Sequence, residues 1–169
     1  MSDIRREMPI LARHEGVWDG TYRYYDAEGE KTDEHTSRLI CRLPDEGPHP
    51  YHQTNYYRWP DGQTEERDFP AFLKNGRIEF DSDLIEGWAG EIGLDDFKRT
   101  IMLNWVRKGD PDLYLYEMIQ ISDCGRFRHR TWHWYREGRL LQRTAIDEQK
   151  VSDRWQDIEG ESYAGDRIE

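Results

Sequence analysis

The feature that most constrains this fold is an alternation of side-chain types with a period of two, which starts near Gly16 and continues to Val151. A period of two is typical of β-strands, because successive side chains point to opposite faces of a sheet. In the segment RFRHRTWHWYREG, one face of the expected strand carries Phe127, His129, Thr131, His133 and Tyr135, and the other carries Arg128, Arg130, Trp132 and Trp134. Both faces bear rings or charged groups, which indicates a barrel wall with a partly polar lumen and a partly covered outer surface.

The alternation divides into about ten candidate strands with short turns between them. The candidate strands span residues 17–26, 35–43, 51–59, 65–73, 77–81, 85–92, 97–107, 113–122, 126–136 and 140–151. Turns such as Asn75-Gly76 and Glu137-Gly138 contain residues that tolerate the positive φ of tight hairpins. Short local connections indicate an antiparallel meander, and closing it on itself removes both exposed edges. We therefore predict an all-β fold, a closed antiparallel up-and-down β-barrel, with a short helical segment at its N-terminus.

Composition decides between a folded and a disordered chain and limits the partners. A mean hydropathy of −1.06 and a net charge of −11 lean towards disorder. The 7 Trp, 10 Tyr and 5 Phe argue for a folded domain, because disordered chains are poor in aromatic residues. The pI near 5.0 opposes nonspecific attraction to nucleic acid or to anionic lipid. We expect neither nucleic acid nor a membrane as a partner.

One domain accounts for the periodic part of the chain. We expect the barrel domain to span residues 1–151, with residues 1–15 as a helical lead-in and residues 152–169 as an acidic C-terminal tail in which Trp155 contacts the barrel wall. Cys41 and Cys124 could form one disulfide, but their spacing is not that of a metal or redox site, and we favour two reduced thiols. The N-terminal residues lack a signal-peptide pattern, and no segment approaches the about 18 apolar residues of a membrane span. We expect a cytoplasmic protein.

Four motifs resemble a known family. They are HEGVWDG at 14–20, YRWPDG at 57–62, YEMIQ at 116–120 and RTWHW at 130–134, and together they resemble a bacterial lipocalin-like (calycin) family of uncharacterised function. Gly16-Val17-Trp18 is similar to the G-x-W signature of lipocalins, in which the Trp closes the base of the barrel and an Arg from a late strand lies across it. The resemblance implies Arg143 for that role, with Arg136 second. It implies a closed barrel and no single activity.

Glu117 is the first candidate for chemistry. It lies in LYLYEMIQI and shares a strand face with Leu115 and Ile119. A carboxylate on an apolar face must pair with a cation or take a raised pKa, and either arrangement is common in active sites. We expect a general acid or base or, as the alternative, a structural ion pair with Arg128 or Arg130 of the neighbouring strand.

Two histidines of the segment 126–136 are the next candidates. His129 and His133 share a face, about 13 Å apart at about 3.3 Å per residue, so they cannot bind one metal ion by themselves. We expect no metal site and no cofactor. One reading is two hydrogen-bonded barrel histidines, and the other is that one of them is a general acid or base, because histidine titrates near neutral pH.

Other polar and aromatic residues could contact a ligand. Gln53, Asn55 and Tyr57 share one strand face, although the pattern leaves open which face is internal. By analogy with the G-x-W signature, Trp18, Gly20, Tyr22 and Tyr24 point inward, and the missing side chain at Gly20 leaves room near the barrel floor. The candidate catalytic residues are Glu117, His133, Tyr57 and Arg130, and the candidate ligand-binding residues are Trp18, Tyr22, Asn55, Trp88, Trp105, His129 and Trp132. For the tryptophans, plain core packing is the alternative.

These residues favour a small hydrophobic or aromatic molecule as the partner. One hypothesis is a cofactor-independent isomerase, lyase or cyclase, in which Glu117 or His133 moves a proton and Tyr57 or Arg130 stabilises negative charge. The alternative is a non-catalytic carrier or sensor, including a haem carrier with His129 or His133 as axial ligand. Aromatic and Arg-rich outer faces are consistent with a homodimer. No nucleotide-binding or zinc-protease motif is present.

Overall fold

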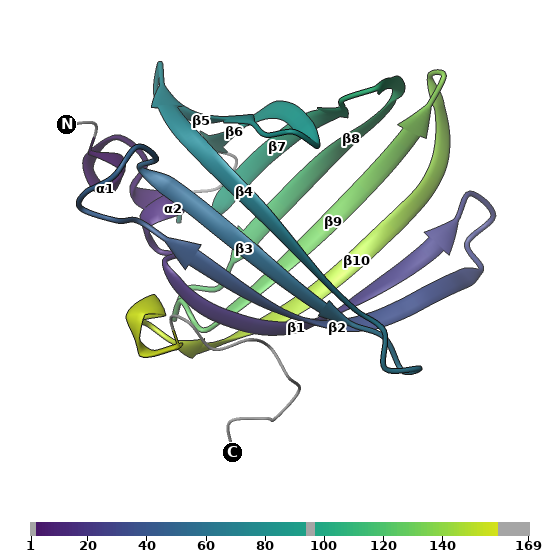
Figure 1. The fold of residues 1–169 in the computed structure, drawn as a ribbon, viewed down its shortest axis with the longest axis horizontal. Helices are drawn as coiled ribbons and strands as arrows, with labels where there is room; N and C mark the ends of the chain where they lie inside the picture. The colour runs from purple at the N-terminus through teal and green to yellow at the C-terminus, as the bar shows by residue number, and fades with distance from the viewer. Residues whose placement is uncertain (1–2, 94–96, 159–169) are drawn as a thin grey trace.

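The chain forms a closed barrel of ten antiparallel strands in consecutive order, with β10 returning to pair with β1 (Figure 1). The computed structural model describes residues 3–93 and 97–158. The strands are β1 (Gly16–Asp26), β2 (Lys31–Arg42), β3 (Tyr51–Arg58), β4 (Thr64–Lys74), β5 (Arg77–Asp81), β6 (Ile85–Ile92), β7 (Thr100–Arg107), β8 (Asp110–Ile121), β9 (Phe127–Arg136) and β10 (Arg139–Ser152). The predicted all-β up-and-down barrel is confirmed.

Two of the predicted turns have the backbone conformation that their sequences favour. At the β4–β5 turn Asn75 and Gly76 have φ angles of 54° and 72°, and at the β9–β10 turn Glu137 and Gly138 have φ angles of 50° and 75°. Two consecutive residues with positive φ match the twist of the flanking strands in a two-residue hairpin. These turns fix the register of the hairpins that they close.

Two short helices close one end of the barrel. Helix α1 (Ile4–Glu7) begins after Asp3, whose carboxylate accepts a hydrogen bond from the Arg6 amide, and α2 (Pro9–Ala12) begins at a proline. Apolar side chains of both helices are buried in one cluster with residues of the barrel interior. The Glu91 carboxylate of β6 accepts a hydrogen bond from the Leu11 amide at 2.9 Å. The predicted helical lead-in therefore covers this end of the barrel.

The structure settles which strand faces are internal. On β9 the side chains of Arg128, Arg130 and Trp132 are buried, whereas that of His129 is exposed. On β3 the face with Gln53, Asn55 and Tyr57 lines the interior. Sequence pattern alone could not make this choice, because both faces of each strand carry polar groups or rings.

The C-terminal residues that the structure describes pack on the outside of the barrel. A short 3₁₀ helix, η1 (Trp155–Ile158), brings Trp155 and Ile158 against Val17 and Ile40. The Trp155 indole N–H donates to Glu15 at 3.1 Å. The rest of the expected tail, 159–169, lies outside the described residues.

Two further findings concern the thiols and the helices. Cys41 is buried, Cys124 is exposed, and both are free, as the preferred reading expected. Within residues 3–93 and 97–158, no helix has both the length and the apolar character needed to cross a membrane.

Candidate functional site

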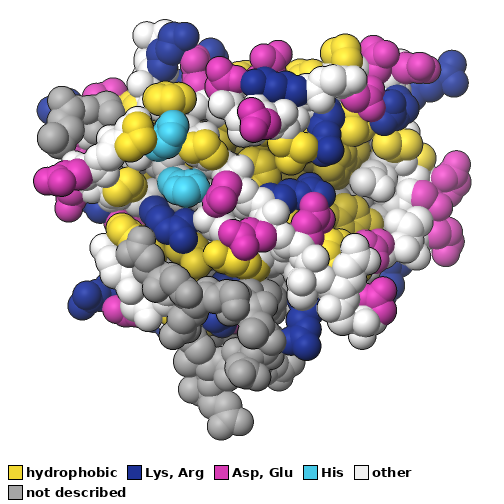
Figure 2. Space-filling model, in the orientation of Figure 1, with side chains coloured by type: hydrophobic (Ala, Val, Ile, Leu, Met, Phe, Trp, Pro, Cys, Tyr) yellow, Lys and Arg dark blue, Asp and Glu magenta, His cyan; other side chains and the backbone are white. Residues whose placement is uncertain are grey.

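The candidate site is a cavity inside the barrel with an apolar wall and a polar wall. Its apolar wall includes Phe69, Ile78, Phe80, Ile101, Leu103 and Ile119, and its polar residues include Gln53, Asn55, Tyr57, Glu117 and Arg130. Water can occupy about 80 Å³ of it. In Figure 2 the molecule is hollowed on one side, where hydrophobic side chains are visible in depth and basic side chains lie beside them.

A chain of hydrogen bonds runs along the inner face of β3. The Tyr51 hydroxyl donates to the Gln53 side chain at 2.8 Å, the Gln53 amide donates to Asn55 at 2.7 Å, and the Asn55 amide donates to the Tyr57 hydroxyl at 2.7 Å. Burial raises the pKa of Tyr57, so its phenol stays protonated at neutral pH. The Tyr57 O–H is therefore available as a donor at the cavity wall.

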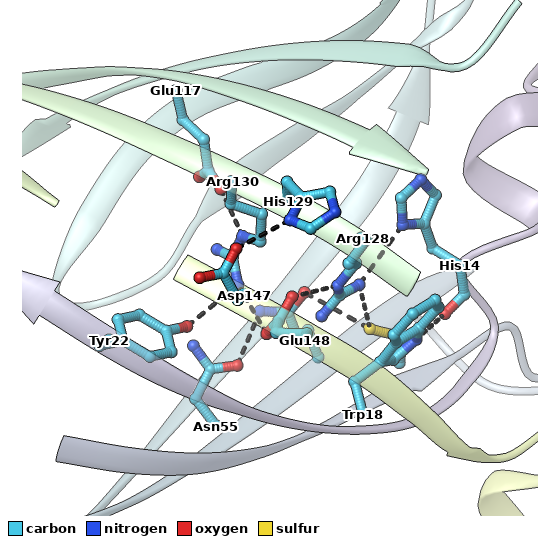
Figure 3. A network of polar contacts seen from close by, with 12 residues as sticks. His14, Trp18, Tyr22, Asn55, Glu117, Arg128, His129, Arg130, Asp147 and Glu148 are labelled. Atoms are coloured by element: carbon cyan, nitrogen blue, oxygen red, sulfur yellow. Dashed lines mark hydrogen bonds and ion pairs between the residues drawn. The ribbon is translucent and has the colours of Figure 1, made fainter. Parts of the chain in front are cut away.

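A buried ion-pair network joins β8, β9, β10 and β1 (Figure 3). The Arg130 Nε donates to Glu117 Oε1 at 2.5 Å, and another Arg130 nitrogen donates to the Tyr22 hydroxyl at 3.0 Å and lies 3.4 Å from Glu148 Oε1. Burial by itself would lower the pKa of Arg130, but Glu117, Tyr22 and Glu148 together more than offset this effect, and the pKa is raised. The ion pair expected for Glu117 is present, with Arg130 as its partner.

Glu148 connects this pair to a second buried arginine. The Arg128 guanidinium donates to Glu148 Oε2, lies 3.4 Å from His14 Nδ1, and lies over the Trp18 ring at 4.4 Å from its centroid. Burial and then the Arg128 charge lower the pKa of His14 well below its ordinary value, so His14 is neutral. The network thus contains two arginines and two glutamates.

The cation over Trp18 is not the one that the resemblance implied. Arg143 is exposed and Arg136 pairs with Asp110 near a barrel end, so neither lies on Trp18. Arg128 takes the position, because β9 presents its even-numbered residues to the interior. The expectation of an arginine from a late strand was correct, and the residue was wrong.

Gly20 makes space for the network. A Cβ at this position would lie 2.5 Å from the Glu148 side chain and 2.5 Å from the Asp147 carbonyl oxygen. The room that the sequence suggested beside Trp18 is therefore filled by Glu148. Glu148 was not among the predicted site residues, although a glycine facing inward on the neighbouring strand is a signal that could have indicated a buried side chain there.

His35 lies in an aromatic cluster at the inner surface of β1 to β3. Its ring stacks on Tyr22 at 4.9 Å between centroids and contacts Tyr57 at 5.0 Å and Trp59 at 4.4 Å. Burial lowers the pKa of His35 to about 4, and the Asp33 carboxylate offsets only part of this effect. Neither ring nitrogen has a hydrogen-bond partner among the residues described. His35 was not among the site residues predicted from the sequence.

Six of the predicted site residues line the cavity. They are Asn55, Tyr57, Trp105, Glu117, Arg130 and Trp132. The Trp132 indole N–H is buried without an acceptor in the described part of the chain. Trp18 and Tyr22 are fully buried in the adjacent core cluster, where Tyr22 bonds to Arg130. The sequence therefore located much of this wall.

Three predicted site residues lie on the outer surface instead. His129 pairs with Asp147 at 2.8 Å, and His133 lies on the same outer face of β9. Trp88 faces outward from β6 under the Arg77 guanidinium at 5.3 Å. Their strands present the neighbouring residues, Arg130, Trp132 and Ala89, to the interior. As placed, these side chains do not reach the cavity, and neither histidine can be an axial ligand to haem bound there.

Two cavity arginines were not selected from the sequence. Arg67 of β4 and Arg107 of β7 line the cavity and are half-buried. Arg67 Nε donates to Glu65 Oε1 at 2.7 Å, and its guanidinium lies 5.8 Å from the Tyr57 ring centroid. A search of residues 3–93 and 97–158 finds no cluster of three or more His, Cys, Asp or Glu able to hold a metal ion.

Together these features define a lipocalin-like closed barrel with an internal cavity. No protein-family model and no curated protein matches the chain. Solved structures share its fold. The S-type phycobiliprotein lyase CPES from Guillardia theta has a TM-score of 0.65 at 11% identity, with 89% of this chain and 98% of that chain covered. Rv2717c from M. tuberculosis has a TM-score of 0.59 at 14% identity, with 88% and 99% covered.

A third similar structure is larger. A protein of unknown function from the DUF3598 family of Nostoc punctiforme has a TM-score of 0.64 at 15% identity. The match covers 83% of this chain but 49% of the Nostoc chain, so this chain spans about half the length of that protein. At these identities the similarities establish the barrel fold alone.

Proposed function

We propose that the barrel binds a small molecule whose apolar, ring-sized part enters the cavity and whose polar atoms meet the hydrogen-bonding wall. The observation that carries this proposal is the division of one cavity into an apolar wall and a polar wall. Burying apolar surface provides affinity, and a few fixed polar groups provide orientation. The Tyr57 hydroxyl is a donor available for such orientation.

The cavity volume limits the part of the ligand that enters. Pockets that bury a drug-sized molecule are typically about 300–1,000 Å³, and here water can occupy about 80 Å³. One ring or a short chain fits this space without rearrangement. The fold shared with a phycobiliprotein lyase supports a bilin as one candidate ligand, but most of such a pigment would lie outside the enclosed space unless side chains move.

A cavity-filling substitution tests the proposal. Leu103→Trp places a large ring in the cavity, whereas Met102→Trp places the same ring on the outer face of the same strand. Binding of N-phenyl-1-naphthylamine, followed by its fluorescence, should be lost in the first variant and retained in the second. Far-UV circular dichroism checks that both variants fold. Equal binding by both folded variants would reject the cavity as the binding site.

A second candidate function is acid-base catalysis by Glu117. It is the one carboxylate that lines the cavity, and Arg130 occupies only its Oε1, so Oε2 has no hydrogen-bond partner in the described chain. A carboxylate held at one oxygen by arginine can accept a proton at the other. This arrangement favours an isomerase, lyase or cyclase over a passive carrier. Tyr57 is the nearby donor for developing negative charge.

The catalytic candidate has a direct test. Native mass spectrometry of protein purified from its own host would identify a retained molecule, and that compound or its relatives would be incubated with the wild type. Glu117→Gln should abolish conversion and keep binding, whereas the exposed Glu66→Gln should change neither. Conversion at an unchanged rate in Glu117→Gln would exclude the carboxylate as the acid or base and leave the carrier function.

A further inference from the structure

The cavity is electropositive in a strongly acidic protein. Among the residues that the structure describes, three arginines, Arg67, Arg107 and Arg130, and one carboxylate, Glu117, line it, although the whole chain has a net charge of −11. Positive lining in a negative chain is not a consequence of composition. A concave site that concentrates one sign of charge attracts ligands of the other sign.

Two of these three charges are already compensated. Arg130 pairs with Glu117 and Glu148, and Arg67 pairs with Glu65. Arg107 makes no ion pair and no side-chain hydrogen bond with any described residue of the chain. Among the described residues it is therefore the cavity cation that remains free to bind an anion.

Arg67 and Arg107 are more exposed to solvent than Arg130. Arg130 is 6% exposed and lies in the interior, whereas Arg67 and Arg107 are partly exposed to solvent while they line the same cavity. An anionic group at Arg107 would keep part of its hydration and gain charge-assisted hydrogen bonds from the planar guanidinium. The apolar wall would then hold the remainder of the molecule.

We propose that the ligand is an anionic amphiphile, with a ring or chain end in the apolar part of the cavity and a carboxylate or similar acidic group at Arg107, assisted by Arg67. This inference rests on the proposed binding function and specifies its ligand class. It excludes a neutral hydrocarbon as the preferred ligand, because such a molecule would leave the Arg107 charge without a partner.

A pair of probes with the same ring system tests the charge requirement. 8-Anilinonaphthalene-1-sulfonate carries a sulfonate, and N-phenyl-1-naphthylamine lacks it. Arg107→Gln should weaken sulfonate-probe binding by about tenfold, a moderate effect for one charged hydrogen-bonding group at a partly exposed site, and should change neutral-probe binding less than twofold. The matched control is Arg143→Gln, on the exposed outer face of β10, which should change neither affinity.

Salt and a conservative variant give independent readouts. Increasing ionic strength should weaken the sulfonate probe and leave the neutral probe unchanged, because the Arg107 charge is within reach of solvent ions. Arg107→Lys should keep more sulfonate affinity than Arg107→Gln. An Arg107→Gln protein that binds the sulfonate probe within twofold of the wild type overturns the proposal. If Arg107→Gln does not fold, equal salt dependence of both probes in the wild type overturns it instead.

The outcomes separate this inference from the proposed function. Neutral-probe binding that is lost in Leu103→Trp, with no preference for the sulfonate, keeps the cavity function and rejects the anionic ligand class. Binding of both probes that is unaffected by Leu103→Trp rejects the cavity function and, with it, this proposal.

Discussion

Replacing Glu148 with its neutral analogue, glutamine, should destabilise the barrel more than a neutral substitution of any other residue in the buried ion-pair network. Glu148 is fully buried and pairs with both Arg128 and Arg130. Glu148→Gln removes the only carboxylate that pairs with Arg128 in the described chain, while Arg130 keeps Glu117. The substitution therefore leaves one buried guanidinium uncompensated.

The expected loss of unfolding free energy follows from this one uncompensated charge. Removing one partner of a buried ion pair costs about 3–5 kcal/mol of unfolding free energy. For a chain of this length that corresponds to a fall in Tm of roughly 6–20 °C, at about 2–4 °C for each kcal/mol. Glu117→Gln should cost less, about 1–3 kcal/mol, because Arg130 still lies near Glu148 and the new amide can accept its hydrogen bond.

Urea unfolding, followed by tryptophan fluorescence and by far-UV circular dichroism, measures these free energies. The matched control is Asp147→Asn, one residue away on the outer face of β10, where the carboxylate is 59% exposed and pairs with Arg23 and His129. It should cost less than about 1 kcal/mol. If Glu148→Gln costs no more than Asp147→Asn, the idea that this network requires charge balance is wrong.

Three other perturbations have defined outcomes. The folded-state pKa of His35 is about 4, below the ordinary 6.5, so between these pH values the unfolded chain binds more protons than the folded chain. Acidification to pH 5 should therefore lower the unfolding free energy of the wild type by about 2 kcal/mol more than that of His35→Gln, measured by urea unfolding. Gly20→Ala should cost about 1–3 kcal/mol by thermal unfolding. Gly93→Ala should be near neutral, because a Cβ at this position meets no atom of the described residues within 4 Å. Trp155→Ala should cost roughly 2 kcal/mol in the same assay, since it loses its packing and its bond to Glu15; an unchanged Tm would show that η1 adds no stability.

Period and turn chemistry made the barrel predictable from sequence. Side chains repeat every two residues on a strand, and residues such as Asn75-Gly76 have few alternatives to a tight hairpin, so both signals are local. Strand β2 begins at Lys31, earlier than predicted, because residues 31–34 pair with β1 although no apolar side chain marks them. Signals of pairing are weakest where a hairpin extends into solvent.

The internal face was harder to predict than the strands. On β9 both faces carry rings and cations, so Trp132 and His133 had equal claims to the interior, and the answer depends on how the neighbouring strands pack. The same ambiguity placed Trp88 among the expected ligand contacts, although Ala89 faces inward. Glu117 was placed correctly because one face of its strand is apolar apart from this residue.

The distinction between paired and unpaired polar groups separates stability from recognition in this barrel. A buried group that already has its partners, as Arg130 has with Glu117, Glu148 and Tyr22, has little left to offer a ligand and is held in place by its ion pairs. A group that lines the cavity without a partner among the described residues, such as the half-exposed Arg107, can exchange its bound water for a polar group of a ligand. Substitutions in the first class should therefore lower the unfolding free energy before they change ligand choice. Substitutions in the second class should change ligand choice in a barrel that keeps its stability.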